Sequence, residues 1–327
     1  MNTIARIRPT TACAALATAL CALLAVTPHA GATTAPAQKT FPTPEDAAAA
    51  LVAAAKANDT KAMLAVLGPD GKTVVTSGDP VADETARARF AASYNEAHKI
   101  VAGNDNTMVL QTGKDEWPMP IPLVNTDQGW RFDTAAGKDE ILTRRIGRNE
   151  LSTIQSCLAY ADAQREYYER NPAKTAPPSY AQHIASSKGK KDGLYWDTAE
   201  GEPDSPLGPE FATARAQGYS PGHGKPMPYH GYFFHILTAQ GPHAPGGAYD
   251  YVAHGKMIGG FALVAYPAEY GSSGIMTFLV NQQGAVYEKN LGPSSAKLAQ
   301  AMKNFDPDET WTKISDDAGE KPAAPPA

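Results

Sequence analysis

The clearest strand pattern along the chain lies near the carboxyl end, from Gly271 to Gly292. Apolar residues fill most of both faces of Ile275–Val280, which is typical of a strand inside a sheet. A turn at Asn281–Gly284 follows, and Ala285–Lys289 mixes β-branched and aromatic residues with charges, as a half-exposed neighbour does. The pattern predicts a β-hairpin in the middle of a C-terminal sheet, with further strands at Tyr232–Leu237 and Phe261–Ala265.

A helical period replaces this strand pattern elsewhere. Thr43 precedes Pro44 and two acidic residues, the order that favours a helix start. The longest stretch with a helical period is Lys138–Glu169, in which Gly147 is a candidate position for a break in the helix. An apolar stripe lies beside Cys157 in this stretch. The stripe consists of Leu151, Ile154, Leu158 and Ala161. Helices are expected from Thr43 to Lys56, Thr60–Leu67, Arg87–His98, Lys138–Glu169 and Ser295–Phe305.

Short strands follow the first helices, at Thr107–Thr112, Ile121–Asn125 and Gly129–Asp133. Prolines and the turn before Gly129 separate them, so the N-terminal part is expected to be a small α+β domain with a meander. Helices laid against a curved sheet that ends in Gly-Trp-Arg-Phe-Asp resemble the cystatin-like half-barrels, which include the nuclear-transport-factor-2-like domains. This resemblance covers about a third of the chain.

The amino-terminal residues have the pattern of a secretory signal peptide. Arg6 and Arg8 precede an apolar run, Ala12–Val26, and small residues follow at 30–32, with cleavage expected after Ala32. No later stretch reaches the roughly 20 apolar residues of a membrane-spanning helix, so a periplasmic or secreted protein is expected. The expected organisation is a signal peptide at 1–32, a flexible linker at 33–40, α+β domains at 41–137 and 138–315, and a disordered tail at 316–327.

Charge limits the classes of partner to expect, and cysteine content limits the disulfide and thiol chemistry. The formal net charge of the 327-residue chain is −5, and loss of the leader would remove two arginines. An acidic surface disfavours nucleic acid and anionic membranes, because both require basic contacts. Loss of the leader would also leave Cys157 as the single cysteine, which excludes an internal disulfide. Its place beside an apolar stripe favours a buried thiol over a nucleophile.

Five motifs stand out in the second half: Arg144–Leu151, Asp192–Trp196, His230–Tyr232, Gly260–Pro267 and the hairpin of Gly271–Gly292. In this order they resemble the motifs of the bacterial envelope proteins known as the domain of unknown function 2950 family. The family name implies a fold and no reaction. The long helix, glycine-rich connection and hairpin also resemble the globular part of type IV pilins and type II secretion pseudopilins, which implies a helix packed on an antiparallel sheet.

Histidines are the first candidates for chemistry, since five of them fall within 32 residues, at 223, 230, 235, 243 and 254. No HExxH or HxH motif and no cysteine accompanies them, so they are interpreted as scattered loop residues, and neither a metal nor a cofactor is expected. The alternative is an undescribed hydrolase or metal-dependent enzyme with His230, His235 or His254 as its acid or base.

Arginines form the one local basic cluster, at Arg144, Arg145 and Arg148. Arg144 and Arg148 are four residues apart on one helical face, where two guanidinium groups could clamp a carboxylate or a phosphate. The alternative is that the cluster forms ion pairs with Glu140, Glu150 or the other domain.

Aromatic and polar residues in glycine-rich loops are the remaining candidates for a binding site: Asp192, Tyr195, Trp196, Tyr229, His230, Tyr232 and Tyr251. Aromatic anchors in loops often carry recognition, but they can equally attach such loops to the sheet. The leading hypothesis is a binding or assembly module of the envelope, without catalysis, for a protein, peptide or glycan. An enzyme, or an accessory factor of a secretion or pilus machine, is the alternative.

Overall fold

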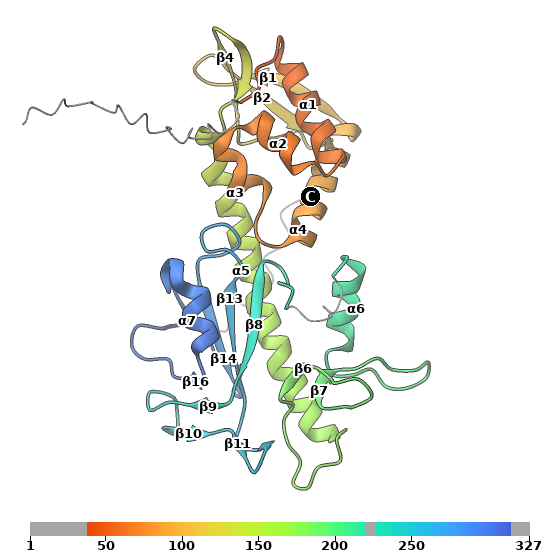
Figure 1. Cartoon of the computed structure of the whole chain (residues 1–327), viewed down its shortest axis with the longest axis vertical. Coiled ribbons are helices and arrows are strands. Elements are labelled where there is room, and N and C mark those ends of the chain that lie inside the picture. Colours follow the sequence, from red (N-terminus) through yellow and green to blue (C-terminus); the bar gives the residue numbers. More distant parts are fainter. Residues whose placement is uncertain (1–37, 220–225, 315–327) are drawn as a thin grey trace, which may run out of the picture. The chain divides into compact units, whose positions relative to one another are not determined.

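The computed structural model describes residues 38–219 and 226–314, which form an α+β protein (Figure 1). The predicted signal peptide, most of the predicted linker, the tail and His223 lie outside these residues. Within the described ranges no sheet closes into a barrel. No helix there is both long enough and apolar enough to cross a membrane.

The N-terminal part packs helices against an antiparallel sheet. The helices are α1 (Pro44–Lys56), α2 (Thr60–Leu67), α3 (Lys72–Val75) and α4 (Pro80–Glu96), with a 3₁₀ turn at Pro69–Gly71. The strands are β1 (His98–Ala102), β2 (Thr107–Thr112), β3 (Trp117–Pro118), β4 (Leu123–Thr126) and β5 (Gly129–Phe132), in the order β1-β2-β4-β5 with β3 on β2. Leu51, Ile121 and Phe132 lie in its core.

Capping residues set the ends of these helices. The Thr43 side chain accepts a hydrogen bond from the Asp46 N–H and caps α1, which begins at Pro44 and ends at Lys56 as predicted, and α2 has the predicted bounds. The start predicted for α4 at Arg87 is wrong, because Asp79 caps the helix through the Ala82 N–H and Pro80 occupies its first turn. The predicted end at His98 is also wrong, since that residue opens β1 opposite Thr112.

Helix α5 (Thr134–Arg170) runs for 37 residues and passes Gly147 without a break. Its first half contributes Ile141 to the N-terminal core, and its second half contributes to the C-terminal core. The apolar residues buried there are Ile154, Cys157, Tyr160, Ala161, Ala163 and Tyr167. Cys157 is therefore buried, as predicted, and its burial raises the pKa of the thiol to about 12. The predicted stripe is wrong at one position, because Leu151 is 42% exposed.

The C-terminal sheet has the order β17-β15-β14-β13-β8 and is antiparallel throughout. Its strands are β8 (Tyr232–Leu237), β13 (Ala262–Pro267), β14 (Thr277–Asn281), β15 (Val286–Lys289) and β17 (Thr312–Lys313). The predicted hairpin is confirmed as β14 and β15, and every residue of β14 is buried in the middle of the sheet. Helix α5 contacts β13, β14 and β15 (Figure 1).

Smaller elements complete this part of the chain. They are β6 (His183–Ala185), β7 (Gly193–Tyr195), α6 (Gly208–Ala216), β9 (Ala239–Gln240), β10 (Tyr249–Asp250), β11 (Val252–Ala253), β12 (Lys256–Met257), a 3₁₀ turn (Gly292–Ser294), α7 (Ser295–Ala301) and β16 (Asn304–Phe305). The helix predicted to reach Phe305 ends at Ala301 instead, because Asn304 and Phe305 pair in parallel with β9 and the Phe305 ring is fully buried.

Candidate functional site

A groove of about 990 Å³ lies between α5, α6 and β8. On the α5 side its wall consists of small residues, Ser152, Ser156 and Ala159. Positions three and four apart share one face of a helix, so these small residues form a strip along α5 that adjoins its buried face, and Tyr160 of that face also lines the groove. Phe233 and Phe234 of β8, with Leu263 of β13, supply the aromatic and aliphatic surface beside it.

Helix α6 forms the other wall and is anchored by aromatic contacts. The Phe211 ring stacks on Tyr195 with ring centroids 4.0 Å apart and an angle of 3° between the planes. Arg215 covers the same tyrosine at 5.2 Å and forms an ion pair with Asp197 at 3.0 Å. Tyr195 is only 8% exposed, so it supports the groove wall from behind.

One end of the groove is built around the buried carboxylate of Asp79, from the N-terminal part of the chain. Its Oδ2 accepts hydrogen bonds from the Tyr219 hydroxyl and from the Gly231 N–H, both at 2.8 Å. Its Oδ1 caps α4 through the Ala82 N–H at 3.1 Å. This single side chain therefore fixes a helix start and two points of the segment that leads into β8.

The backbone at His230 and Gly231 makes this contact possible. Both residues have positive φ, 50° and 76°. A Cβ at Gly231 would come within 2.6 Å of the Asn149 Nδ2, so only glycine fits this approach. The His230 N–H donates to the Tyr219 hydroxyl at 3.3 Å. Burial lowers the pKa of the His230 imidazole, although Asp79 opposes this, and burial with Asp79 raises the pKa of Tyr219.

The arginine cluster divides into separate roles. Arg144 pairs with Glu140 at 2.7 Å. Arg145 donates to the carbonyl oxygens of Thr73 and Val74, so it links α5 to α3. Arg148 is exposed and has no hydrogen bond or ion pair with another described residue. Partial burial of its guanidinium, together with Arg89 and Arg144, lowers the pKa of Arg148.

The next residues of the same motif hold the loop before β14. The Asn149 amide donates to the Ser273 carbonyl at 2.8 Å. The Glu150 carboxylate accepts the backbone N–H groups of Ile275 and Met276, both at 2.9 Å. Asn149 and Glu150 thus connect α5 to the entry of the central strand and have a structural role.

The structure brings Tyr229 and His230 into the groove and places the other aromatic and polar candidates elsewhere. Tyr232 is fully buried, and its hydroxyl donates to the Met276 carbonyl at 3.0 Å. Tyr251 is also fully buried and donates to Gln240 at 3.1 Å. Asp192 accepts the Ser187 N–H at 2.7 Å, and Trp196 packs against Tyr167. These four side chains stabilise the second half of the protein and do not line the groove.

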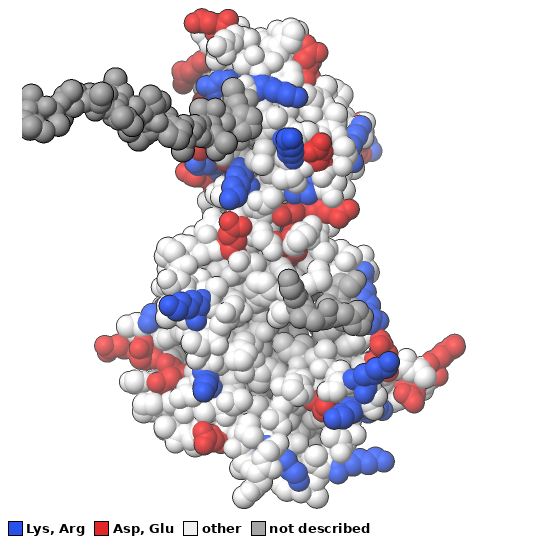
Figure 2. Space-filling view, viewed as in Figure 1, with Lys and Arg blue, Asp and Glu red and all other residues white. Residues whose placement is uncertain are grey.

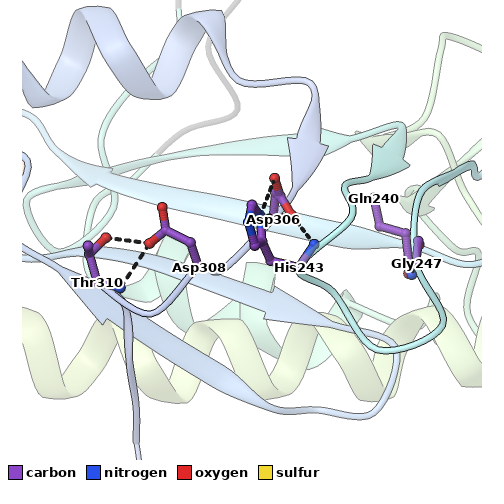
Figure 3. A network of polar contacts seen from close by, with 6 residues as sticks. All are labelled: Gln240, His243, Gly247, Asp306, Asp308 and Thr310. Atoms are coloured by element: carbon purple, nitrogen blue, oxygen red, sulfur yellow. Dashed lines mark hydrogen bonds and ion pairs between the residues drawn. The ribbon is translucent and has the colours of Figure 1, made fainter.

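The described histidines occupy different elements. His235 and His254 are exposed, on β8 and between β11 and β12. His243 contacts Asp306, whose Oδ1 also accepts the His243 N–H at 2.8 Å (Figure 3). Across residues 38–219 and 226–314, no three histidine, cysteine or acidic side chains form a group that could hold a metal ion.

Sequence reasoning missed Asp79, Tyr219, Arg215 and the strip of small residues on α5. The Asp79-Pro80 pair was a helix-start signal, which would have placed α4 correctly. The spacing of Ser152, Ser156 and Ala159 also marked a face of α5 without large side chains. Nothing local indicated that Asp79 meets Gly231, because this contact joins residues 152 positions apart.

Few charges lie over the middle of the C-terminal part on the face shown in Figure 2, where lysine, arginine and acidic side chains gather mainly toward the margin. The fold and the groove together define an α+β protein with a preformed, largely apolar groove beside a sheet edge.

Residues 38–314 match the family model described as a protein of unknown function, DUF2950, and the chain belongs to this family. Neither the curated proteins nor the solved structures contain a significant match to the chain.

Proposed function

We propose that this protein is a binding or assembly module of the cell envelope that acts without catalysis and holds part of a partner protein or peptide in the α5–α6–β8 groove. The observation that carries the proposal is the groove itself. Its volume of about 990 Å³ and its aromatic and aliphatic wall are those of a ligand site, in which a few polar groups orient an apolar ligand.

Support also comes from how the walls are held. Asp79 fixes the end of the groove, and the stacked Tyr195 and Phe211 rings fix α6. A site whose walls are ordered before binding loses less conformational entropy when a partner arrives. A glycan is the weaker candidate, because most of the lining consists of carbon atoms rather than hydrogen-bonding groups.

The location in the envelope rests on the signal-peptide pattern of residues 1–32. The finer fold assignment is likewise proposed. The helices and antiparallel sheet at 41–137 support a cystatin-like domain, and α5 packed on the C-terminal sheet supports a pilin-like domain.

Photo-crosslinking in cells that produce the protein tests the groove. A benzoylphenylalanine at Ala214, which lines the groove on α6, should yield a specific adduct that mass spectrometry identifies. The same label at Leu298, which is 46% exposed on α7 and outside the groove, is the matched control. Ala159→Trp should fill the groove and abolish the adduct. Identical adducts from both positions, or an adduct that survives Ala159→Trp, would refute the proposal.

A further inference from the structure

Strand β8 forms an edge of the C-terminal sheet, because β13 is its only strand partner among the described strands. The Ala268 N–H donates to the Gly231 carbonyl, which sets the alternation of the antiparallel ladder. Phe233, His235 and Leu237 therefore direct their backbone groups toward β13. Phe234 and Ile236 direct their N–H and C=O groups outward, and no described residue pairs with them.

This open edge borders the groove, because Phe233 and Phe234 are residues of β8 and also line the groove. At the edge of a sheet, outward N–H and C=O groups on alternate residues can form hydrogen bonds with another extended polypeptide, which then adds to the sheet as a further strand. The apolar wall beside them would receive side chains of that strand. The groove therefore combines backbone pairing with pockets for side chains.

The edge is available over a short length only. The Tyr229 N–H donates to the Tyr232 carbonyl, and the Tyr232 N–H donates to the Tyr229 carbonyl. Tyr229 thus occupies the next outward position of β8, and an added strand must end before it reaches Tyr232. At the other end of β8, Thr238 is already bonded to Lys303 and Tyr251. The open segment accommodates about four residues of a partner.

Two arginines that lack an ion pair with a described residue lie toward the end that Tyr229 closes, the end at which Asp79 is buried and Glu210 lines the groove. Arg148 lies one helical turn before Ser152, which lines the groove on the same face of α5. Arg89 of α4 lies close enough to lower the pKa of Arg148. Neither arginine has a hydrogen bond or ion pair with another residue in the described ranges, whereas neighbouring Arg144 is paired with Glu140. A negatively charged group of the partner could form ion pairs with these two arginines.

The direction of β8 decides which end of a partner meets them. Gly231, before β8, lies against Asn149, and Leu237 pairs with Ala262, whose carbonyl accepts the Tyr160 hydroxyl. Strand β8 and helix α5 therefore run in the same direction, with Arg148 toward the start of β8. A strand that adds antiparallel to β8 brings its carboxyl end to this position.

We propose that the groove binds the free carboxyl terminus of a partner polypeptide. The last four or so residues pair antiparallel with Phe234 and Ile236, and the terminal carboxylate lies at Arg148 and Arg89. This inference rests on the proposed binding function and specifies its ligand. A parallel strand is disfavoured, because it would place a positively charged amino terminus beside the two arginines.

Two libraries of octapeptides with the same sequences test the inference, one with free carboxyl termini and one with carboxamides. Fluorescence anisotropy then measures the enriched sequences on the full-length protein. Free carboxylates should bind about tenfold or more tightly than their amides, the effect of a charge-assisted hydrogen bond. Arg148→Gln should remove this difference. Arg165→Gln, at a half-exposed arginine of α5 that does not line the groove, should preserve it.

N-methylation of the peptide backbone supplies a readout that does not depend on protein variants. Methyl groups on alternate amides should abolish binding, and those on the intervening amides should have little effect, because only alternate N–H groups face β8. Equal binding of carboxylates and amides, no alternation, or no enriched carboxylate sequence would overturn the inference. Suppose that carboxylates and amides bind equally, or that N-methylation shows no alternation. If Ala159→Trp still abolishes peptide binding, the inference about the ligand fails but the proposed groove function stands. Binding unaffected by Ala159→Trp would overturn that function itself.

Discussion

Substitution at the Asp79–Tyr219 contact gives the most direct test of how the groove is held. Tyr219→Phe removes the hydrogen bond to the buried Asp79 carboxylate at 2.8 Å and the longer bond, at 3.3 Å, that the Tyr219 hydroxyl accepts from the His230 N–H. Bonds to charged groups contribute about 1.5–3 kcal/mol, so the free energy of unfolding should fall by about 2 kcal/mol. Asp79→Ala would also remove the α4 cap and leave Gly231 unsatisfied. The total loss of about 4–7 kcal/mol approaches the whole stability of many domains.

Asp79→Asn is therefore the better partner for a double-mutant cycle. It keeps one oxygen for the cap but places an amide opposite the Gly231 N–H, and we expect a loss of about 2–4 kcal/mol. In that background Tyr219→Phe should cost about 1 kcal/mol or less, because the charged acceptor is already gone. Urea unfolding followed by circular dichroism measures all four proteins.

Tyr229→Phe is the matched control, since the Tyr229 ring contacts Tyr219 but its hydroxyl has no hydrogen bond to a described residue. It should change stability by less than about 0.5 kcal/mol. If Tyr219→Phe is no more costly than Tyr229→Phe, or costs the same with Asp79 and with Asn at that position, the carboxylate does not hold the groove end as described.

Other consequences concern α5. Gly137→Ala would bring a Cβ within 2.2 Å of the Pro120 carbonyl and should lower the free energy of unfolding by about 1–3 kcal/mol, whereas Gly147→Ala meets no atom within 4 Å and should raise it by about 0.5–1 kcal/mol in the same urea titration. The Cys157 thiol should react with Ellman's reagent at pH 8 only on unfolding, once Cys13 and Cys21 are replaced by serine; rapid labelling of the native protein would contradict its burial. Because the pKa of Cys157 is about 12 when folded and 9.0 in its ordinary state, its contribution to stability is complete below pH 9 and is lost as pH rises toward 12. Cys157→Val should flatten that fall by up to about 1.4 kcal/mol per pH unit, and an unchanged slope would show that the thiol does not titrate in this way.

Local signals in the sequence were sufficient for the elements whose ends are decided by near neighbours. Thr43 and Pro44 start α1, and the apolar run through Leu279 predicted a central strand that the sheet confirms. His98 was misassigned because helical spacing continues past Glu96, while pairing with Thr112, fourteen residues away, makes it part of a strand. Tertiary pairing outweighed local propensity at this position.

The groove was harder to predict, because its parts are distant in sequence. Tyr229 and His230 were recognised as candidates from their glycine-rich surroundings, but Asp79, which fixes them, had no signal beyond its place before a proline. Tyr232 and Tyr251 share the same composition of neighbours and are buried in the core. Aromatic residues in glycine-rich segments therefore do not by themselves distinguish recognition from packing.

The continuity of α5 limits how the protein can be divided for experiments. A cut between residues 137 and 138, the boundary expected from the sequence, falls in the first turn of this helix. The upstream fragment would lose Ile141 from its apolar cluster and Arg145 from the carbonyl groups of Thr73 and Val74. An autonomous N-terminal piece should therefore extend at least through Arg145, and truncation at Gly137 should yield a poorly folded, aggregation-prone product.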